Sequence, residues 1–189
     1  MIEELVQKTR SYRRFYENEP VSEATLRGLV NLARLAASGS NKQPLKYILS
    51  CETTTNNLIF SQLGWAGYLG GWKPAEGERP AAYIIVLGDR NIKPTFGFDP
   101  GIAAQNIVLG ATEQGLGGCM ITTVRRVELS RLFNITEQYE ILLVIALGKP
   151  KEVVQLETLG ADGDVKYWRD EAGVHHVPKR ALDDIIISR

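Results

Sequence analysis

The sequence predicts a single α+β domain spanning residues 1–189, a sandwich of helices and strands rather than a doubly wound fold. Segments with helical periodicity and apolar strand-like runs are both present, but they do not alternate strictly as β-α-β units. The composition is 44% apolar and 23% charged, which is ordinary for a soluble globular chain of this length. We find neither an internal repeat nor a low-complexity tract.

The first half is predicted to contain two helices followed by two strands. A short amphipathic helix opens the chain, and a second helix begins after Ser22, whose hydroxyl suits an N-cap, and ends at Gly39. Residues 45–51 and 81–87 are interpreted as strands, the latter fully buried because all seven residues are apolar or aromatic. The stretch 53–80 between them is rich in glycine, asparagine and aromatic residues and is expected to be partly helical.

The second half is predicted to contain two helices and two strands before a β-hairpin. The first of these helices begins at an Asp-Pro pair, a typical start, and its alanine and glycine residues would let another helix approach closely. In order, we expect a helix at 100–114, a strand at 118–122, a helix at 127–133, a strand at 141–147, a hairpin over 166–177, and a short helix or strand at 181–187.

The charge balance argues against polymeric or membrane partners. Lysine plus arginine number 22 and aspartate plus glutamate number 22, so no net field recruits nucleic acid or an anionic membrane. No apolar run approaches the roughly 20 residues of a membrane span, and the acidic N-terminus lacks a signal pattern. We expect a cytoplasmic protein in which Cys51 and Cys119 are buried thiols, with no disulfide and no zinc site.

Three arginines cluster in the loop after the first helix, where Arg10, Arg13 and Arg14 surround the hydroxyl of Ser11. The nearest carboxylates along the chain lie beyond Phe15. Planar guanidinium groups can donate two parallel hydrogen bonds to a phosphate. The segment is therefore either a local site for a small anion or a solvated basic turn.

The arginine segment R-S-x-R-R-F and a later loop, S-G-x-N-x-Q-P at residues 38–44, together resemble two motifs of the FMN-dependent nitroreductase family. The usual forms in that family are close to R-R-S-x-R-x-F and P-S-x-x-N-x-Q-P-W. This chain has Thr9, Ala37 and Leu45 where the family has Arg, Pro and Trp. The glycine-rich turn at 115–118 and a basic pair before Leu182 extend the resemblance over nearly the whole chain.

The resemblance implies a mixed, mainly antiparallel sheet flanked by helices, in a homodimer whose intertwined subunits form two flavin sites at their interface. It also assigns the cofactor-binding residues. The phosphate of FMN would be held by Arg10, Ser11, Lys179 and Arg180; Arg13 would lie near the N1 and O2 edge; Ser38 and Asn41 would reach the flavin bound mainly by the partner; and Thr122 and Thr123 would direct a backbone N–H toward N5.

Other catalytic motifs are absent from the sequence. The segment 115–120 has Met at the sixth position of a dinucleotide fingerprint and follows a helix rather than a strand. No phosphate loop and no G-x-S-x-G elbow occur. His175 and His176 are adjacent, so on a strand they face opposite sides and cannot bind one metal; they are interpreted as ordinary hairpin side chains. We expect neither a protein nucleophile nor a metal.

The implied activity is a two-step transfer of hydride, from NAD(P)H to FMN and then to a nitroaromatic or quinone-like acceptor. Two alternatives remain open. The chain could be a flavin-binding protein that stores, senses or remodels FMN without NAD(P)H turnover, or an anion-binding interaction module with no flavin. An aromatic lid is a further hypothesis, with core packing as its alternative; the candidate residues are Trp65, Tyr68, Trp72, Phe96 and Phe98.

Overall fold

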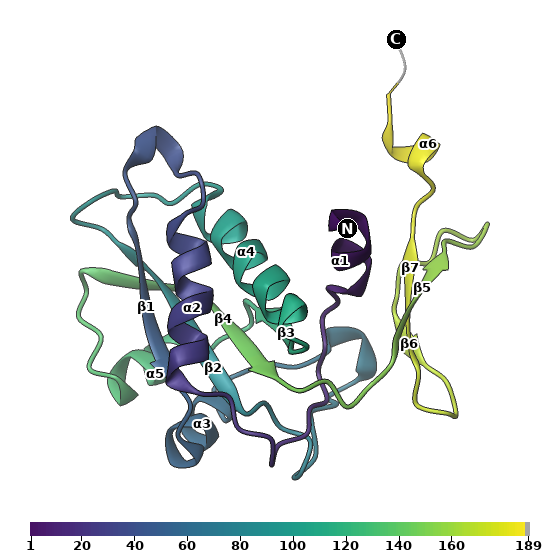
Figure 1. Cartoon of the computed structure of the whole chain (residues 1–189), viewed down its shortest axis with the longest axis horizontal. Helices are drawn as coiled ribbons and strands as arrows, with labels where there is room; N and C mark the ends of the chain where they lie inside the picture. Colours follow the sequence, from purple (N-terminus) through teal and green to yellow (C-terminus); the bar gives the residue numbers. More distant parts are fainter. Residues whose placement is uncertain (188–189) are drawn as a thin grey trace.

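A four-stranded antiparallel sheet forms the centre of the computed structural model, which describes residues 1–187 (Figure 1). Its strand order is β1-β2-β4-β3, and a second sheet of order β5-β7-β6 lies at the other end of the long axis from β1. The strands of the main sheet are β1 (Leu45–Ser50), β2 (Ala82–Asp89), β3 (Gly117–Ile121) and β4 (Tyr139–Gly148); those of the small sheet are β5 (Val154–Thr158), β6 (Trp168–Arg169) and β7 (His175–Lys179).

Helices cover both faces of the main sheet, which confirms the predicted α+β class. The helices are α1 (Ile2–Lys8), α2 (Glu23–Arg34), α3 (Thr53–Phe60), α4 (Asp99–Glu113), α5 (Arg126–Leu132) and α6 (Leu182–Ile185), with short 3-10 turns at Gly39–Asn41 and Gly67–Leu69. Helices α2 and α4 pack on the face that carries Ile84 and Val86, whereas α3 and α5 pack on the face that carries Tyr83 and Ile85. Strand β2 is therefore buried throughout, as its apolar run predicts.

Most predicted elements agree with the structure to within a few residues. Ser22 caps α2 as expected, because its Oγ accepts a hydrogen bond from the backbone N–H of Thr25 at 3.0 Å. The alanine- and glycine-rich helix α4 uses its small residues inside the subunit, since a Cβ on Gly110 would lie 2.2 Å from Leu32 of α2. Close helix packing was thus predicted correctly, and its partner is an internal helix.

The C-terminal third differs from the prediction. Strands β6 and β7 pair in antiparallel fashion as the expected hairpin, but β7 also pairs in parallel with β5, which was not predicted. The segment Val154–Thr158 begins with alternating apolar and polar residues, so a strand signal is present, but its partner is the second strand of the hairpin, where Val154 pairs with His175. Cys51 is half-buried rather than buried, whereas burial raises the pKa of the Cys119 thiol to about 11.

The lid candidates divide by exposure. Trp65 and Phe96 are buried, Tyr68 and Phe98 are exposed, and Trp72 is half-buried. The ring of Phe96 lies on Gly88 of β2, where a Cβ would come within 2.3 Å of the ring. Core packing therefore accounts for Phe96.

We expect the substitution Gly88→Ala to lower the free energy of unfolding by about 1 to 3 kcal/mol, because the added methyl group displaces a buried ring. The matched control is Gly28→Ala, at an exposed position inside α2 where a Cβ meets nothing within 4 Å. That change should raise stability by about 1 kcal/mol through helix propensity. Urea denaturation of both variants measures the difference, and equal effects would contradict the packing described for Phe96.

Candidate active site

The first arginine motif runs beside the edge strand of the main sheet. Ser11 forms an isolated parallel bridge with Gly118 of β3, and the backbone N–H of Tyr12 donates to the carbonyl of Gly118 at 3.1 Å. Glycine is needed at position 117, because a Cβ there would lie 2.6 Å from the Tyr12 ring. Two segments far apart in the sequence therefore meet along β3.

A pocket of about 230 Å³ opens where these two segments meet. Arg13 comes from the arginine motif, and Thr122 and Thr123 lie exposed just after the end of β3. Strand β3 also contributes Cys119, Met120 and Ile121 to the lining. The loop after α3 contributes Gly64, Trp65, Ala66 and Gly67, and the segment just before β6 contributes Tyr167. The structure thus brings together three of the predicted cofactor-binding residues.

The loop after α3 forms another wall of the pocket. The backbone N–H of Gly64 donates to the carbonyl of Thr123 at 2.8 Å, and a Cβ on Gly64 would lie 2.5 Å from the Thr123 methyl group. Ala66 then adopts a left-handed conformation with φ of 42°. Trp65 is 8% exposed, and its indole Nε1 has no hydrogen-bond partner among residues 1–187. This wall is therefore formed by a backbone segment fixed to Thr123 and by a buried aromatic side chain.

Glu152 fixes the backbone of the arginine motif. Its fully buried carboxylate accepts hydrogen bonds from the backbone N–H groups of Arg13 and Arg14, the latter at 3.1 Å. The same carboxylate pairs with the guanidinium of Arg169 at 2.6 Å. Arg169 in turn lies over the Trp72 ring, 4.0 Å from its centroid. Glu152 thereby links the arginine motif to the segment that leads into the small sheet.

Arg14 is neutralised locally, contrary to the expectation that nearby carboxylates are lacking. Its guanidinium donates to both carboxylate oxygens of Glu78, at 2.6 and 2.8 Å. Hydrogen bonding from Arg14 holds the pKa of Glu78 below its ordinary value, and Lys151 adds a second positive charge at 3.3 Å. The sequence does not reveal this partner, because Glu78 lies 64 residues downstream of Arg14.

Within residues 1–187, Arg10 forms no ion pair with a carboxylate. Its Nη2 donates to the carbonyl of Val6 at 2.8 Å, and its Nε is buried with no hydrogen-bond partner in the described chain. Burial lowers the pKa of this guanidinium. Lys179 and Arg180 lie exposed at the end of β7, and within residues 1–187 no hydrogen bond or ion pair joins them to Arg10 or Ser11. The phosphate assignment of these four residues therefore stays a prediction.

The loop that carries Ser38 and Asn41 lies away from this pocket and is fixed by Asp99 at the start of α4. Ser38 Oγ donates to Asp99 at 2.6 Å, and the backbone N–H of Gly39 donates to it at 2.9 Å. Burial alone would raise the pKa of Asp99, but these two hydrogen bonds, the charge of Lys93 and a hydrogen bond to its own backbone together lower the pKa. Ser40, Asn41 and Gln43 all have φ near +50°, so the loop is held in a strained conformation.

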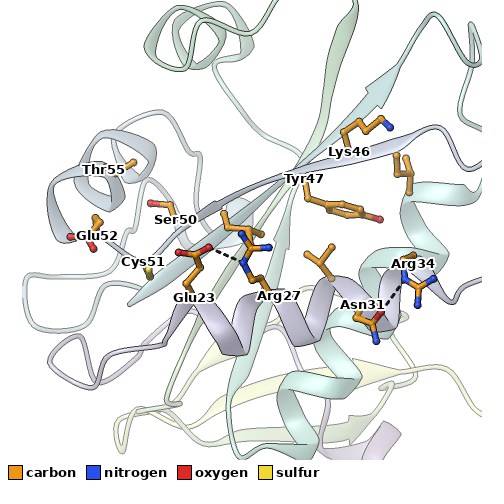
Figure 2. A pocket seen from close by; sticks show the side chains of 13 residues that line it. Glu23, Arg27, Asn31, Arg34, Lys46, Tyr47, Ser50, Cys51, Glu52 and Thr55 are labelled. Carbon is orange, nitrogen blue, oxygen red and sulfur yellow. Dashed lines mark hydrogen bonds and ion pairs between the residues drawn. The ribbon is translucent and has the colours of Figure 1, made fainter.

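A second cavity, of about 700 Å³, is a groove between α2 and the edge strand β1 (Figure 2). Arg27 and Arg34 extend from α2 beside it and pair with Glu23 and Asn31, respectively. Burial raises the pKa of Tyr47, on the β1 side, to about 12. None of the predicted cofactor-binding residues lines this groove.

Comparison with known proteins identifies the class of fold. The crystal structure of a nitroreductase family protein from Streptococcus pneumoniae TIGR4 superimposes with a TM-score of 0.71 at 17% identity over the whole of both chains. An FMN-dependent nitroreductase from Clostridium difficile R20291 gives a TM-score of 0.65 at 22% identity, over 80% of this chain and 88% of that one. The sheet and helices described above are thus arranged as in nitroreductases.

The sequence profile of the nitroreductase family matches residues 6–57 and 73–149, more than half of the chain. The protein belongs to the nitroreductase family. A curated relative from Archaeoglobus fulgidus, named provisionally as an NADH dehydrogenase/NAD(P)H nitroreductase, is 26% identical over 153 residues, which cover 76% of this chain and 83% of the relative. Residues 58–72 and 150–189 lie outside the profile match, and they supply Trp65 and Tyr167 to the pocket.

No group of three or more His, Cys, Asp or Glu side chains in residues 1–187 is arranged to hold a metal ion. No helix in the same range has both the length and the apolar character needed to cross a bilayer.

We expect Glu152→Ala to lower the free energy of unfolding by about 3 to 5 kcal/mol, because it leaves the buried side of Arg169 and two backbone N–H groups without an acceptor. The matched control is Glu140→Ala, which removes an exposed ion pair to Arg90 and should change stability by at most about 1 kcal/mol. Chemical denaturation at 25 °C compares them. A loss as small for Glu152 as for Glu140 would contradict its linking role.

Proposed function

We propose that the protein is an FMN-dependent oxidoreductase that accepts hydride from NAD(P)H and passes it to nitroaromatic or quinone-like acceptors. The observation that carries this proposal is the meeting of Arg13 with Thr122 and Thr123 in one pocket of a nitroreductase-family fold. Relatives support it by name, since one is called an FMN-dependent nitroreductase and another an NAD(P)H nitroreductase.

The donor set of the pocket fits a flavin ring. Arg13 is the single charged side chain among the lining residues, and the backbone after β3 at Thr122 and Thr123 also borders the pocket. The isoalloxazine ring offers carbonyl and ring-nitrogen acceptors to such donors. No carboxylate lines the pocket to repel an electron-rich ligand. The residues present therefore suit the group that the family implies.

Each predicted residue has a role in this proposal. FMN, when bound, supplies the ring that takes up and releases hydride. Arg13 places a fixed positive charge beside the edge where negative charge develops, and the backbone after β3 at Thr122 and Thr123 offers N–H donors without adding a competing acid. The phosphate is held by Arg10 and Ser11 together with Lys179 and Arg180, which lie on the C-terminal arm, the segment of residues 150–187. The chain's own task is binding and orientation.

We also propose that the working unit is a homodimer. A pocket of about 230 Å³ lies below the roughly 300 to 1,000 Å³ of typical cofactor sites. Ser38 and Asn41 lie on the loop between α2 and β1, on the far side of the molecule from the small sheet, so they would act on a partner's flavin (Figure 1). The C-terminal arm also exposes apolar side chains suited to burial against a second copy, namely Leu182, Ile185, Ile186 and Ile187.

The purified protein should be yellow, and heat should release FMN rather than FAD, because the basic residues can hold one phosphate and no dinucleotide motif is present. Chromatography of the released flavin and steady-state oxidation of NADH and NADPH with a nitroaromatic or quinone test this. FAD as the main species would remove the basis for the FMN assignment. Bound FMN without NAD(P)H turnover would indicate a flavin-storing or flavin-sensing protein, and a colourless protein that takes up no flavin would indicate an anion-binding module.

Arg10→Ala and Arg180→Ala should each weaken FMN binding by about ten- to a hundredfold, the equivalent of one charge-assisted hydrogen bond. Arg27→Ala is the matched control, because Arg27 is an exposed arginine on α2 that pairs with Glu23. Fluorescence titration of the apoprotein with FMN gives the dissociation constants of the parent and of the three variants. Binding as tight as the parent's in both test variants would locate the phosphate site elsewhere.

A further inference from the structure

The side chain of Arg13 is held by two residues of the C-terminal arm. Its Nη1 lies 3.2 Å from Nε2 of His175, and its guanidinium lies 4.8 Å from the centroid of the Tyr167 ring. A third contact, from Nη1 to the carbonyl of Ser11 at 3.2 Å, is local. Both His175 and Tyr167 belong to residues 150–189, outside the family profile match.

The donor and the acceptor in the contact between Arg13 and His175 follow from the chemistry of the two side chains. A guanidinium can only donate, so Nε2 of His175 must accept, and the imidazole is neutral with its proton on Nδ1. His175 is 1% exposed on β7. Burial, and then the charge of Arg13, lowers the pKa of His175 to about 4, so the acceptor form persists at neutral pH.

Further contacts restrain the Tyr167 ring and the backbone of Arg13. The ring of Tyr167 lies 5.1 Å from that of His175 and 5.0 Å from that of Tyr68, measured between centroids. On the other side, Glu152 fixes the backbone N–H of Arg13. The arginine is therefore restrained at its backbone, at its charged end and on one face of its guanidinium, before any ligand arrives.

We propose that His175 is a positioning residue that orients the Arg13 guanidinium in the pocket, with Tyr167 as its second support, so that β7 completes the cofactor site. This inference rests on the proposed function, because FMN is the ligand that Arg13 would meet. The two adjacent histidines do face opposite sides, as expected, since His176 pairs instead with Glu157 at 2.7 Å and Asp170 at 3.2 Å. The interpretation of His175 as an ordinary hairpin side chain is incomplete.

Pre-orienting Arg13 has two measurable consequences. A long side chain that is already ordered loses less conformational freedom when the ligand binds, so affinity rises. A fixed positive charge beside the ring also favours the reduced, more negative form of the cofactor, so the midpoint potential rises. Loss of the contact between His175 and Arg13 should reverse both effects. A purely structural role for His175 would instead leave the potential of the bound flavin unchanged.

The test compares His175→Leu, which removes the acceptor at similar size, with His175→Gln, which retains an acceptor oxygen. His176→Gln is the matched control on the opposite face of β7. We expect His175→Leu to weaken FMN binding by about tenfold and to make the midpoint potential more negative. His175→Gln should recover binding to within about threefold of the parent, and His176→Gln should keep the parent's potential.

A double-mutant cycle separates positioning from general damage. In the background of Arg13→Gln, His175→Leu should cause no further change in affinity or potential. Additive effects, or a folded His175→Leu variant with the parent's affinity and potential, would overturn the proposal. If His175→Leu does not fold, as judged by circular dichroism, Tyr167→Leu decides by the same two measurements. A parent protein that binds no FMN refutes the proposed function and this inference with it, whereas a parent that binds FMN with an unaffected variant refutes this inference alone.

Discussion

Burial of the central sheet on both faces is the constraint on which the other features depend. Strands β2 and β4 lie in the middle of the sheet, between one layer formed by α2 and α4 and another formed by α3 and α5. Such a sheet leaves only its outer strands for binding. The candidate site forms at one of them, β3, where the arginine motif and the loop after α3 both attach through backbone hydrogen bonds. The pocket therefore lies at the edge of the sheet and not within the hydrophobic core.

The parts of the fold that the sequence predicts are those encoded by local patterns. An unbroken apolar run identifies β2, and a capping serine identifies the start of α2. The parallel pairing of β5 with β7 is not local, because it joins Val154 to His175 with strand β6 lying between them in the sequence. A five-residue alternating segment gives a weak signal by itself, and nothing in its composition indicates which strand it joins. The small sheet was therefore predicted only in part.

The candidate site shows the same division. Arg13, Thr122 and Thr123 were predicted from motifs and do line one pocket. Trp65, a candidate for the aromatic lid, also lines that pocket. Glu152 and His175 were not assigned to the site, although both are buried and contact Arg13. A lone glutamate or histidine carries no motif, and only tertiary contact reveals that its hydrogen-bonding groups are directed at the arginine segment. The sequence of β7, HHVPK, has no apolar pattern against which a buried His175 would stand out.

The pairing of Ser11 with Gly118 has a consequence for the behaviour of the protein in solution. Residues 11 and 12 occupy part of the outer edge of β3, whose backbone groups would otherwise be open to strands of other molecules. The segment that carries the candidate cofactor-binding arginines therefore also shields this edge of the sheet from pairing with strands of other molecules. Substitutions that detach this segment should promote aggregation as well as weaken ligand binding, so colloidal stability and cofactor affinity are tied to the same few hydrogen bonds.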